Sequence, residues 1–416
     1  MRQAPATRRL LPPSATADAG RLIAARMVRA FADGIVSVLL PAHLTALGFS
    51  ALEIGAIVTG TLIGSAVLTL GVGLLAHGHS PRRLLLAACA LMAATGICFA
   101  SASGFAPLLV VAIVGTLNPT AGDVSVFLPL EQSLLAGAAE PWDHPDLYAR
   151  TNVAAAAAAS LGALASAFPE PLARATGAPL SDAMRAGFVI YALAALVAAA
   201  LYARLRSAPA TPETASPRRP LERSRRVVLR LAALFSLDSF GGGFVVQSLL
   251  ALWLFQRFQF SLADAAAFFF VAMILAGLSQ LLSPRLATRI GLVRTMVYTH
   301  VPANAFLIVA ALMPTAPLAV TFLLLRNALS SMDVPARQAF VMRVVPAEER
   351  AAAASVTNVP RSLGSGLAPL LSGALLARSS FGWPLLVAGA LKISYDLLLL
   401  MAFRHHERDR TDATAW

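Results

Sequence analysis

The stretch LEIGAIVTGTLIGSAVLTLGVGLLA, residues 52–76, contains one charged side chain in 25 positions and lies just before a basic pair, Arg82-Arg83. About 20 apolar residues are enough for a helix to cross the hydrocarbon core of a bilayer, so this stretch predicts a transmembrane helix. Apolar runs that can span occur at 27–47, 52–76, 84–103, 105–135, 151–168, 183–203, 228–255, 262–284, 291–313, 315–341, 352–376 and 381–403. We therefore expect an all-α integral membrane protein with twelve transmembrane helices.

The composition excludes a soluble enzyme, a fibrous protein and a disordered chain. Hydrophobic residues make up 57 % of the chain and charged residues 13 %, against roughly 25 % charged in soluble domains. The mean hydropathy is +0.71. The net charge of +12 does not indicate nucleic acid as a partner, because Lys392 is the single lysine and the arginines form short clusters between apolar runs. Such clusters are typical of basic residues that set membrane orientation.

The arginines also predict the topology. If the N-terminus is inside, the outer loops hold only Arg174, Arg185, Arg257 and Arg378. Because basic residues accumulate in cytoplasmic loops, we expect both termini in the cytoplasm and the protein in the cell (inner) membrane. The expected organisation is a tail at 1–26, a six-helix bundle at 27–206, a polar cytoplasmic linker at 207–226, a second six-helix bundle at 227–403 and a tail at 404–416.

The two halves of the chain repeat each other. At one offset of 206, five residues of the first half recur in the second: Pro129, Gln132, Thr151, Asn152 and Val153 match Pro335, Gln338, Thr357, Asn358 and Val359. Earlier in each half, Phe49-Ser50 and Arg83 recur as Phe260-Ser261 and Arg294 at an offset of 211. Each half has an even number of helices, so the repeats enter the membrane from the same side and are parallel.

Several motifs resemble those of the major facilitator superfamily. The loop GLLAHGHSPRR at 73–83 is similar to the signature that follows the family's second helix, and residues 286–294 form a degenerate second copy. The resemblance covers nearly the whole chain and implies two six-helix bundles that transport by alternating access. It also implies a cytoplasmic gate at His77, Arg82 and Arg83. His77 stands where the family has an aspartate, and a neutral imidazole cannot supply the charge of that carboxylate.

A second motif bears on direction. The stretch GSGLAP at 364–369 resembles, in a looser form, the Gly-Pro pattern of the family's antiporters, which weakly favours export. The alternative is that these small residues let two helices approach closely.

Ionisable residues within the predicted spans point to the transport path. On insertion scales each costs about 2.5–3.5 kcal/mol at the bilayer centre, so each needs a partner or a function. The resemblance implies that helices one, four, seven and ten line the cavity, which gives these proton-coupling and cavity candidates: Asp123, Asp33, Asp238, Arg326 and Asp333. Asp123 is the first choice for proton coupling, and a buried structural pair is the alternative. Lys392 and Asp396, at i and i+4, are expected to pair with each other.

Glu131 and Arg337 form a separate pair of candidates, because the offset of 206 takes one to the other. One half has the acid and the other the base, at equivalent depths near the cytoplasmic ends of helices four and ten. A salt bridge between the halves when the inside is shut is one interpretation, which makes both residues gate candidates. The alternative is that each caps its own helix or extends to the interface.

The remaining features argue against other classes of protein. His77, His79, His405 and His406 lack carboxylate or thiolate neighbours, so no metal site is expected. No Walker loop is present, which excludes ATP as the energy source, and no cofactor is expected. A membrane enzyme would need a catalytic cluster, and a sensor would need a longer soluble tail. The sequence favours a monomeric secondary transporter that exports a small organic molecule, a drug or metabolite, in exchange for protons. Proton-coupled uptake of a polar metabolite is the alternative.

Overall fold

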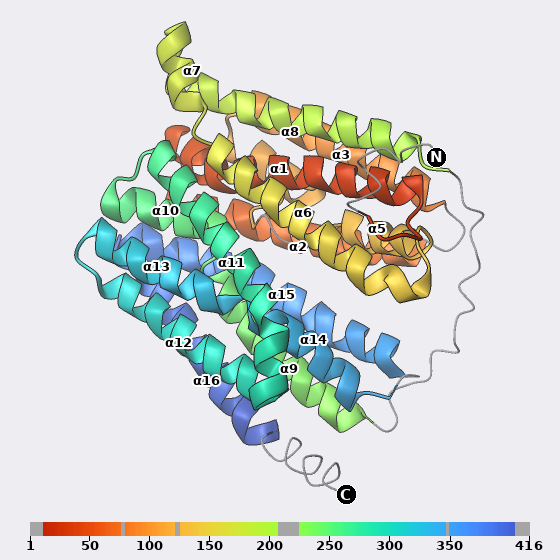
Figure 1. The fold of residues 1–416 in the computed structure, drawn as a ribbon. Coiled ribbons are helices and arrows are strands. Elements are labelled where there is room, and N and C mark those ends of the chain that lie inside the picture. The colour runs from red at the N-terminus through yellow and green to blue at the C-terminus, as the bar shows by residue number, and fades with distance from the viewer. Residues whose placement is uncertain (1–10, 76–79, 121–124, 207–223, 347–348, 404–416) are drawn as a thin grey trace, which may run out of the picture. The chain divides into compact units, whose positions relative to one another are not determined.

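The computed structural model describes residues 11–75, 80–120, 125–206, 224–346 and 349–403. Within these ranges every regular element is a helix (Figure 1). Nine of the predicted spans are single helices: α1 (Ala17–Ala46), α2 (Ala51–Leu75), α3 (Pro81–Ser101), α6 (His144–Ala165), α8 (Leu180–Ala203), α11 (Leu262–Ile290), α12 (Leu292–Leu312), α15 (Arg350–Arg378) and α16 (Trp383–Phe403). A short helix, α7 (Pro169–Thr176), follows α6.

The fourth, seventh and tenth predicted spans are each broken in two. They consist of α4 (Phe105–Val114) with α5 (Phe127–Ala136), α9 (Arg225–Gly243) with α10 (Gln247–Phe258), and α13 (Ala316–Ser330) with α14 (Asp333–Val344). Within the described ranges, eight helical stretches are long and apolar enough to cross a membrane by length and composition alone. The other spans are the broken fourth and tenth and the more polar α1 and α15. The prediction of an all-α integral membrane protein is confirmed.

A hydroxyl group from a neighbouring helix supports each break. A break leaves backbone carbonyl groups without a helical partner, which is costly in a bilayer unless another group donates a hydrogen bond. The donor and acceptor pairs are Tyr191 with the carbonyl of Thr116 (2.8 Å), Ser372 with that of Phe244 (2.8 Å) and Ser283 with that of Met332 (2.6 Å). Irregular backbone is therefore tolerated in these spans because it is bonded inside the protein.

The helices form two compact units, Met1–Thr211 with Phe260–Phe270, and Pro212–Gln259 with Val271–Trp416. The predicted linker at 207–226 overlaps the described residues only at 224–226. The domain limits taken from the sequence therefore stay predictions.

In the first unit, α1 packs closely against α6 and α8. A Cβ atom built at Gly34 would lie 2.1 Å from the carbonyl oxygen of Ala159, and one built at Gly162 would lie 2.0 Å from that of Phe31. Small residues let membrane helices gain van der Waals contact along their backbones. Ala159, the last residue of the alanine run at 154–159, lies on this contact surface.

Replacing Gly34 by alanine is expected to lower the free energy of unfolding by about 1–3 kcal/mol, because the added methyl group forces the two helices apart. Gly71 on α2 is the matched control, since a Cβ there meets no atom within 4 Å. Thermal unfolding of both purified variants measures the difference. Equal stability of the two variants would contradict the close contact of α1 and α6.

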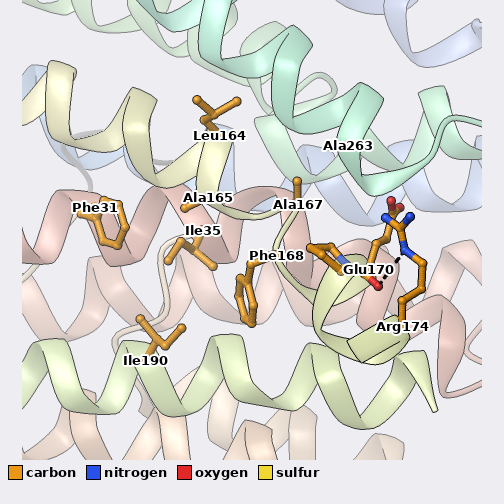
Figure 2. A pocket seen from close by; sticks show the side chains of 11 residues that line it. Phe31, Ile35, Leu164, Ala165, Ala167, Phe168, Glu170, Arg174, Ile190 and Ala263 are labelled. Carbon is orange, nitrogen blue, oxygen red and sulfur yellow. Dashed lines mark hydrogen bonds between the residues drawn. The ribbon is translucent and has the colours of Figure 1, made fainter. Parts of the chain in front are cut away.

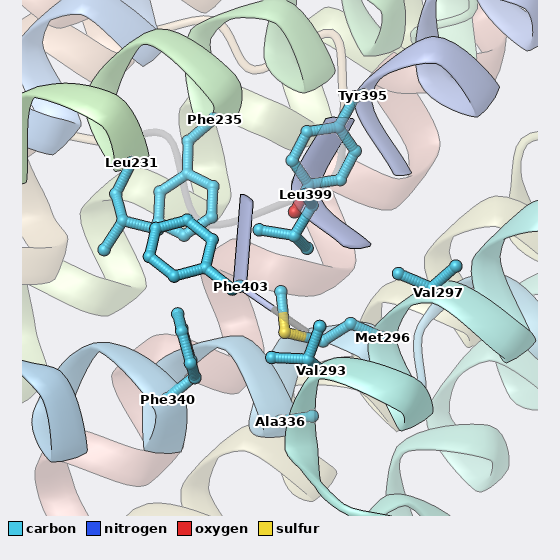
Figure 3. Close-up of a cluster of buried hydrophobic side chains, with 10 residues drawn as sticks. All are labelled: Leu231, Phe235, Val293, Met296, Val297, Ala336, Phe340, Tyr395, Leu399 and Phe403. Atoms are coloured by element: carbon cyan, nitrogen blue, oxygen red, sulfur yellow. The ribbon is translucent and has the colours of Figure 1, made fainter. Parts of the chain in front are cut away.

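The second unit has its hydrophobic core where α9, α12, α14 and α16 meet. Figure 3 shows Leu231 and Phe235 from α9 beside Phe340, Tyr395 and Phe403. Here too one helix pair is in close contact, because a Cβ built at Gly243 on α9 would lie 2.5 Å from the carbonyl oxygen of Ser365 on α15. In both units, therefore, the first span is in close backbone contact with the fifth span: α1 with α6 in the first unit, and α9 with α15 in the second.

A second feature shared by the two units is a serine that holds the chain before the first helix of each. The Ser14 amide and hydroxyl both donate to the Asp143 carboxylate, at 3.2 and 2.6 Å. In the second unit, the Ser224 amide donates to the Glu349 carboxylate at 3.0 Å, and the Ser224 hydroxyl also donates to it. Equivalent contacts at equivalent places agree with the internal repeat read from the sequence.

Candidate functional site

A buried ion pair joins the first and fourth spans of the first unit. Arg29 on α1 donates from Nη2 to Oε1 of Glu131 on α5 at 2.7 Å. The two side chains are 7 % and 1 % exposed, so this pair has little water to screen it. Glu131 is therefore satisfied by a partner within its own unit.

The surroundings of this pair fix its geometry. The Tyr202 hydroxyl donates to the same Glu131 oxygen and accepts from Nε of Arg29 at 3.2 Å. The Arg29 guanidinium lies over the Phe127 ring, 3.9 Å from its centroid, a favourable arrangement for a cation and an aromatic face. Oε2 of Glu131 is buried with no hydrogen-bond partner among the described residues. This free acceptor could take a proton or a donor when the helices move.

Asp33 lies one turn after Arg29 on α1, where Asn118 forms a hydrogen bond with its carboxylate. Asn118 is buried in the irregular backbone between α4 and α5, and its side-chain oxygen accepts from the amide of Thr120 at 3.1 Å. The sequence Asn118-Pro119 therefore marks a break in the span. Asp123, the first choice for proton coupling, lies outside the described residues.

Two of the loop residues assigned to the cytoplasmic gate can be located. The Arg82 guanidinium donates to the carbonyl of Ala203, the last residue of α8, and the Arg83 amide bonds to Ser80 at the start of α3. Basic side chains at a helix C-terminus satisfy its free carbonyl groups. His77 lies outside the described residues, so its role stays a prediction.

The second unit holds a larger network centred on Asp238 of α9. Lys392 on α16 donates to Oδ1 of Asp238 at 2.6 Å, and Arg337 on α14 donates to Oδ2 at 3.0 Å. Arg337 also lies 3.5 Å from Asp333, one turn earlier on its own helix. Asp238 of the seventh span is thus brought together with Asp333 and Arg337 of the tenth.

His300 of α12 extends this network to Asp396. Its Nδ1 lies 3.0 Å from both carboxylate oxygens of Asp396, and its Nε2 lies 3.9 Å from Oδ1 of Asp238. The expected pairing of Lys392 with Asp396 is wrong, because Lys392 bonds to Asp238 and Asp396 bonds to His300. Helix periodicity allowed the first pair, but contacts between helices gave each residue a better partner.

Arg326 on α13 is distinct from the other candidates. Its Nε is buried, with no hydrogen-bond partner among the described residues. A buried polar atom without a hydrogen bond is costly at membrane depth, so Arg326 stays a functional candidate. Arg361 on α15 is better satisfied, because its Nε donates to Ser239 at 3.1 Å.

The two units therefore use one scheme with opposite charges. Glu131 and Arg337 occupy the same position in the two repeats, and each bonds to the first helix of its own unit. Glu131 bonds to Arg29, and Arg337 bonds to Asp238. The alternative that each caps its own helix does not describe these contacts. A salt bridge between Glu131 and Arg337 in another conformation stays a prediction.

The first unit also contains a pocket of about 620 Å³. Figure 2 shows Phe31 and Ile35 of α1 with Ile190 of α8 on its apolar wall, and Glu170 and Arg174 of α7 at one end. Asp33 is not among the lining residues, although Phe31 and Ile35 lie on either side of it in sequence. The pocket and the charged candidates are thus separate features.

Comparison with known proteins decides the family. A model of the Major Facilitator Superfamily matches residues 22–359. The chain belongs to this superfamily. Because it belongs to this family and shares the fold of the transporters described next, this superfamily member is a membrane transporter and not an enzyme.

The proteins to which this superfamily member is similar include an uncharacterized membrane protein and transporters named for different compounds. An uncharacterized membrane protein of Saccharomyces cerevisiae is 25 % identical over 427 residues, covering 94 % of each chain. The nucleoside transporter NupG superposes with a TM-score of 0.70 at 15 % identity, over 93 % of this chain and 99 % of that one. A D-xylose–proton symporter gives a TM-score of 0.72 at 14 % identity, over 92 % and 96 % of the two chains. At such identities the structures show a shared fold alone.

Proposed function

We propose that this superfamily member is a proton-coupled secondary transporter that exports a small organic molecule, a drug or metabolite. The observation that carries the proposal is that each unit contains buried pairs of acidic and basic residues, Arg29 with Glu131 in the first and Asp238 with Arg337 in the second. These residues lie on broken spans or on a span in contact with one. Ionisable residues at membrane depth mark ion and proton pathways more often than they stabilise a fold. Discontinuous helices are also the usual site of substrate binding in secondary transporters.

The proposal includes a location and an orientation. We place the protein as a monomer in the cell (inner) membrane with both termini in the cytoplasm, because its arginines accumulate on that side. His77, Arg82 and Arg83 would form the cytoplasmic gate in that orientation.

The proton-coupling residues we propose are Asp123 and Asp33, before Asp238. Two cations already bond to Asp238, so a proton that arrives there has to displace one of them. Asp33 bonds instead to the neutral side chain of Asn118. A proton can therefore bind to Asp33 without displacing a cation from it.

The first experiment finds a ligand. Thermal unfolding of the purified protein is measured against a library of metabolites and drugs, since a compound that binds the folded state raises its stability. Deleting the gene and testing sensitivity to the same compounds then separates export from uptake. An exporter protects the cell from its substrate, whereas an importer makes the cell sensitive or supplies it with a nutrient.

Replacing Asp33 or Asp123 by asparagine is expected to abolish transport driven by a pH gradient while leaving exchange of the identified compound across a vesicle membrane largely intact. Exchange needs no net movement of protons, so it separates coupling from substrate binding. Asp264→Asn is the control, because Asp264 is exposed and its carboxylate accepts from Ser261, its one hydrogen-bond partner among the described residues, at the start of α11. Gradient-driven transport at the unmodified rate in both test variants would contradict the assignment, and loss of both activities would indicate substrate binding or folding.

A further inference from the structure

His300 lies between two carboxylates that come from different helices. Asp396 on α16 faces Nδ1 of the ring at 3.0 Å, and Asp238 on α9 faces Nε2 at 3.9 Å. The three side chains are 6 %, 0 % and 8 % exposed, in the order His300, Asp396 and Asp238. The histidine is thus enclosed inside the second unit, with an acid beside each ring nitrogen.

These contacts decide where each ring proton goes. Both oxygens of Asp396 are 3.0 Å from Nδ1, so Nδ1 carries a hydrogen and donates it, as a carboxylate neighbour usually requires of an imidazole. Nε2 of the neutral ring then presents a lone pair toward Asp238. A proton added at Nε2 replaces that lone pair with a donor that points to a carboxylate.

We propose that Nε2 of His300 is a binding site for the transported proton, in addition to the carboxylates of the first unit. This inference rests on the proposed proton coupling. The ligand is a single proton, taken from water on one side and released to the other. Binding it converts His300 to an imidazolium held by Asp396 and Asp238.

Protonation of His300 competes with Lys392 for one oxygen atom. Lys392 already donates to Oδ1 of Asp238 at 2.6 Å, and Oδ1 is the same atom that faces Nε2 of His300. An imidazolium that approaches Oδ1 weakens the bond from Lys392, which links α9 to α16. The proton is thereby coupled to the packing of two helices, as a conformational cycle requires.

The other charges around the ring keep this competition balanced. His300 itself faces Asp238 of α9 and Asp396 and Tyr395 of α16. The charged groups that interact with these neighbours are Lys392 of α16, Asp333 and Arg337 of α14 and Arg361 of α15. Tyr395 packs its ring edge-on against His300, with centroids 6.1 Å apart. Three carboxylates (Asp238, Asp333, Asp396) face three directly interacting cations (Arg337, Arg361, Lys392), so a proton on His300 leaves one positive charge in excess. That excess favours release of a cation from Asp238.

The experiment follows the histidine protons directly and needs no substrate. The full-length protein is labelled with ¹⁵N-histidine, and its imidazole signals are recorded as the pH is lowered from 8 to 5, the range in which an ordinary imidazole titrates. One signal is expected to change from an Nδ1-protonated neutral ring to an imidazolium and to be absent in His300→Gln. His43→Gln is the matched control, because His43 is buried and both its ring nitrogens lack a hydrogen-bond partner among the described residues. That variant should keep the titrating signal.

A second variant keeps the test decisive if His300→Gln does not fold. Asp396→Asn retains the histidine but removes the carboxylate that accepts from Nδ1, so Nδ1 protonation of the neutral ring should no longer be fixed. A signal unchanged by Asp396→Asn, or the absence of any titrating signal attributable to His300, overturns the proposal.

Transport measurements separate this inference from the proposed function. In vesicles loaded with the compound identified by thermal unfolding, His300→Gln should lower pH-gradient-driven transport by about tenfold and leave exchange unchanged. Intact gradient-driven transport in His300→Gln overturns the role of His300 and leaves the proposed function standing. If the unmodified protein shows no gradient-driven transport while His300 titrates as described, the proposed function fails, and His300 binds a proton that is not transported, which overturns its role in coupling.

Discussion

Replacing Asp238 by asparagine is expected to lower the free energy of unfolding by about 3–5 kcal/mol, one of the two largest effects that the structure predicts. Asp238 accepts from Lys392 at 2.6 Å and from Arg337 at 3.0 Å, and its side chain is 8 % exposed. Without the carboxylate, two buried cations lose their charged acceptor in a medium that hydrates them poorly. Thermal unfolding of the purified protein measures the loss.

A double replacement tests the cause. Adding Lys392→Met to Asp238→Asn removes one buried charge that the first change left uncompensated, so part of the lost stability should return, since an apolar substitute for a buried ion pair is often tolerated. Asp264→Asn at the exposed start of α11 should leave stability unchanged. If Asp238→Asn is as stable as the unmodified protein, the network does not hold the second unit together.

Hydropathy was enough to predict the spans but not the breaks in them. Each apolar run contains a helix, because a bilayer leaves the backbone no other way to satisfy its polar groups. The break between α9 and α10 follows the run Gly241-Gly242-Gly243, a visible signal that the seventh span is not uniform. The break between α13 and α14 has a weaker local signal, Ser330-Ser331 followed by Pro335. It is stabilised by Ser283, about 50 positions away in the sequence, and a contact of that kind is invisible to a local pattern.

The site residues show the same limit. The repeat relates Glu131 to Arg337, and in the structure each is a charged partner of the first helix of its unit. Arg29 could have been found, since an arginine one turn before Asp33 in an apolar helix is itself an intramembrane charge. His300 was missed because its significance depends on Asp396 and Asp238, which lie 96 and 62 positions away in the chain. Which side chains meet across helices depends on the rotation of each helix, and a single sequence does not contain it.

The second large effect concerns Glu131. Glu131→Arg is expected to cost about 3–5 kcal/mol of stability, because it places a second cation beside Arg29, 2.7 Å from its present acceptor, where both side chains are almost fully buried. The same variant should impair transport. Two compensating changes then distinguish the two partners considered for Glu131: Arg29→Glu restores the pair within the first unit, and Arg337→Glu restores a pair between the two halves.

The contacts favour the first compensation for stability. Arg29→Glu with Glu131→Arg should recover part of the lost stability, with a coupling of about 0.5–3 kcal/mol, as residues in contact usually show. Arg337→Glu should not, because Arg337 bonds to Asp238, and a new carboxylate there would repel Asp238 and Asp333. Transport is the separate measurement. If Arg337→Glu with Glu131→Arg restores transport beyond either single change, the two residues meet during the cycle, and the gate read from the repeat exists alongside the pair seen here. If neither double variant recovers stability or transport, Glu131 acts through Tyr202 and its unpaired oxygen, and the ion pair with Arg29 is not what holds α1 to α5.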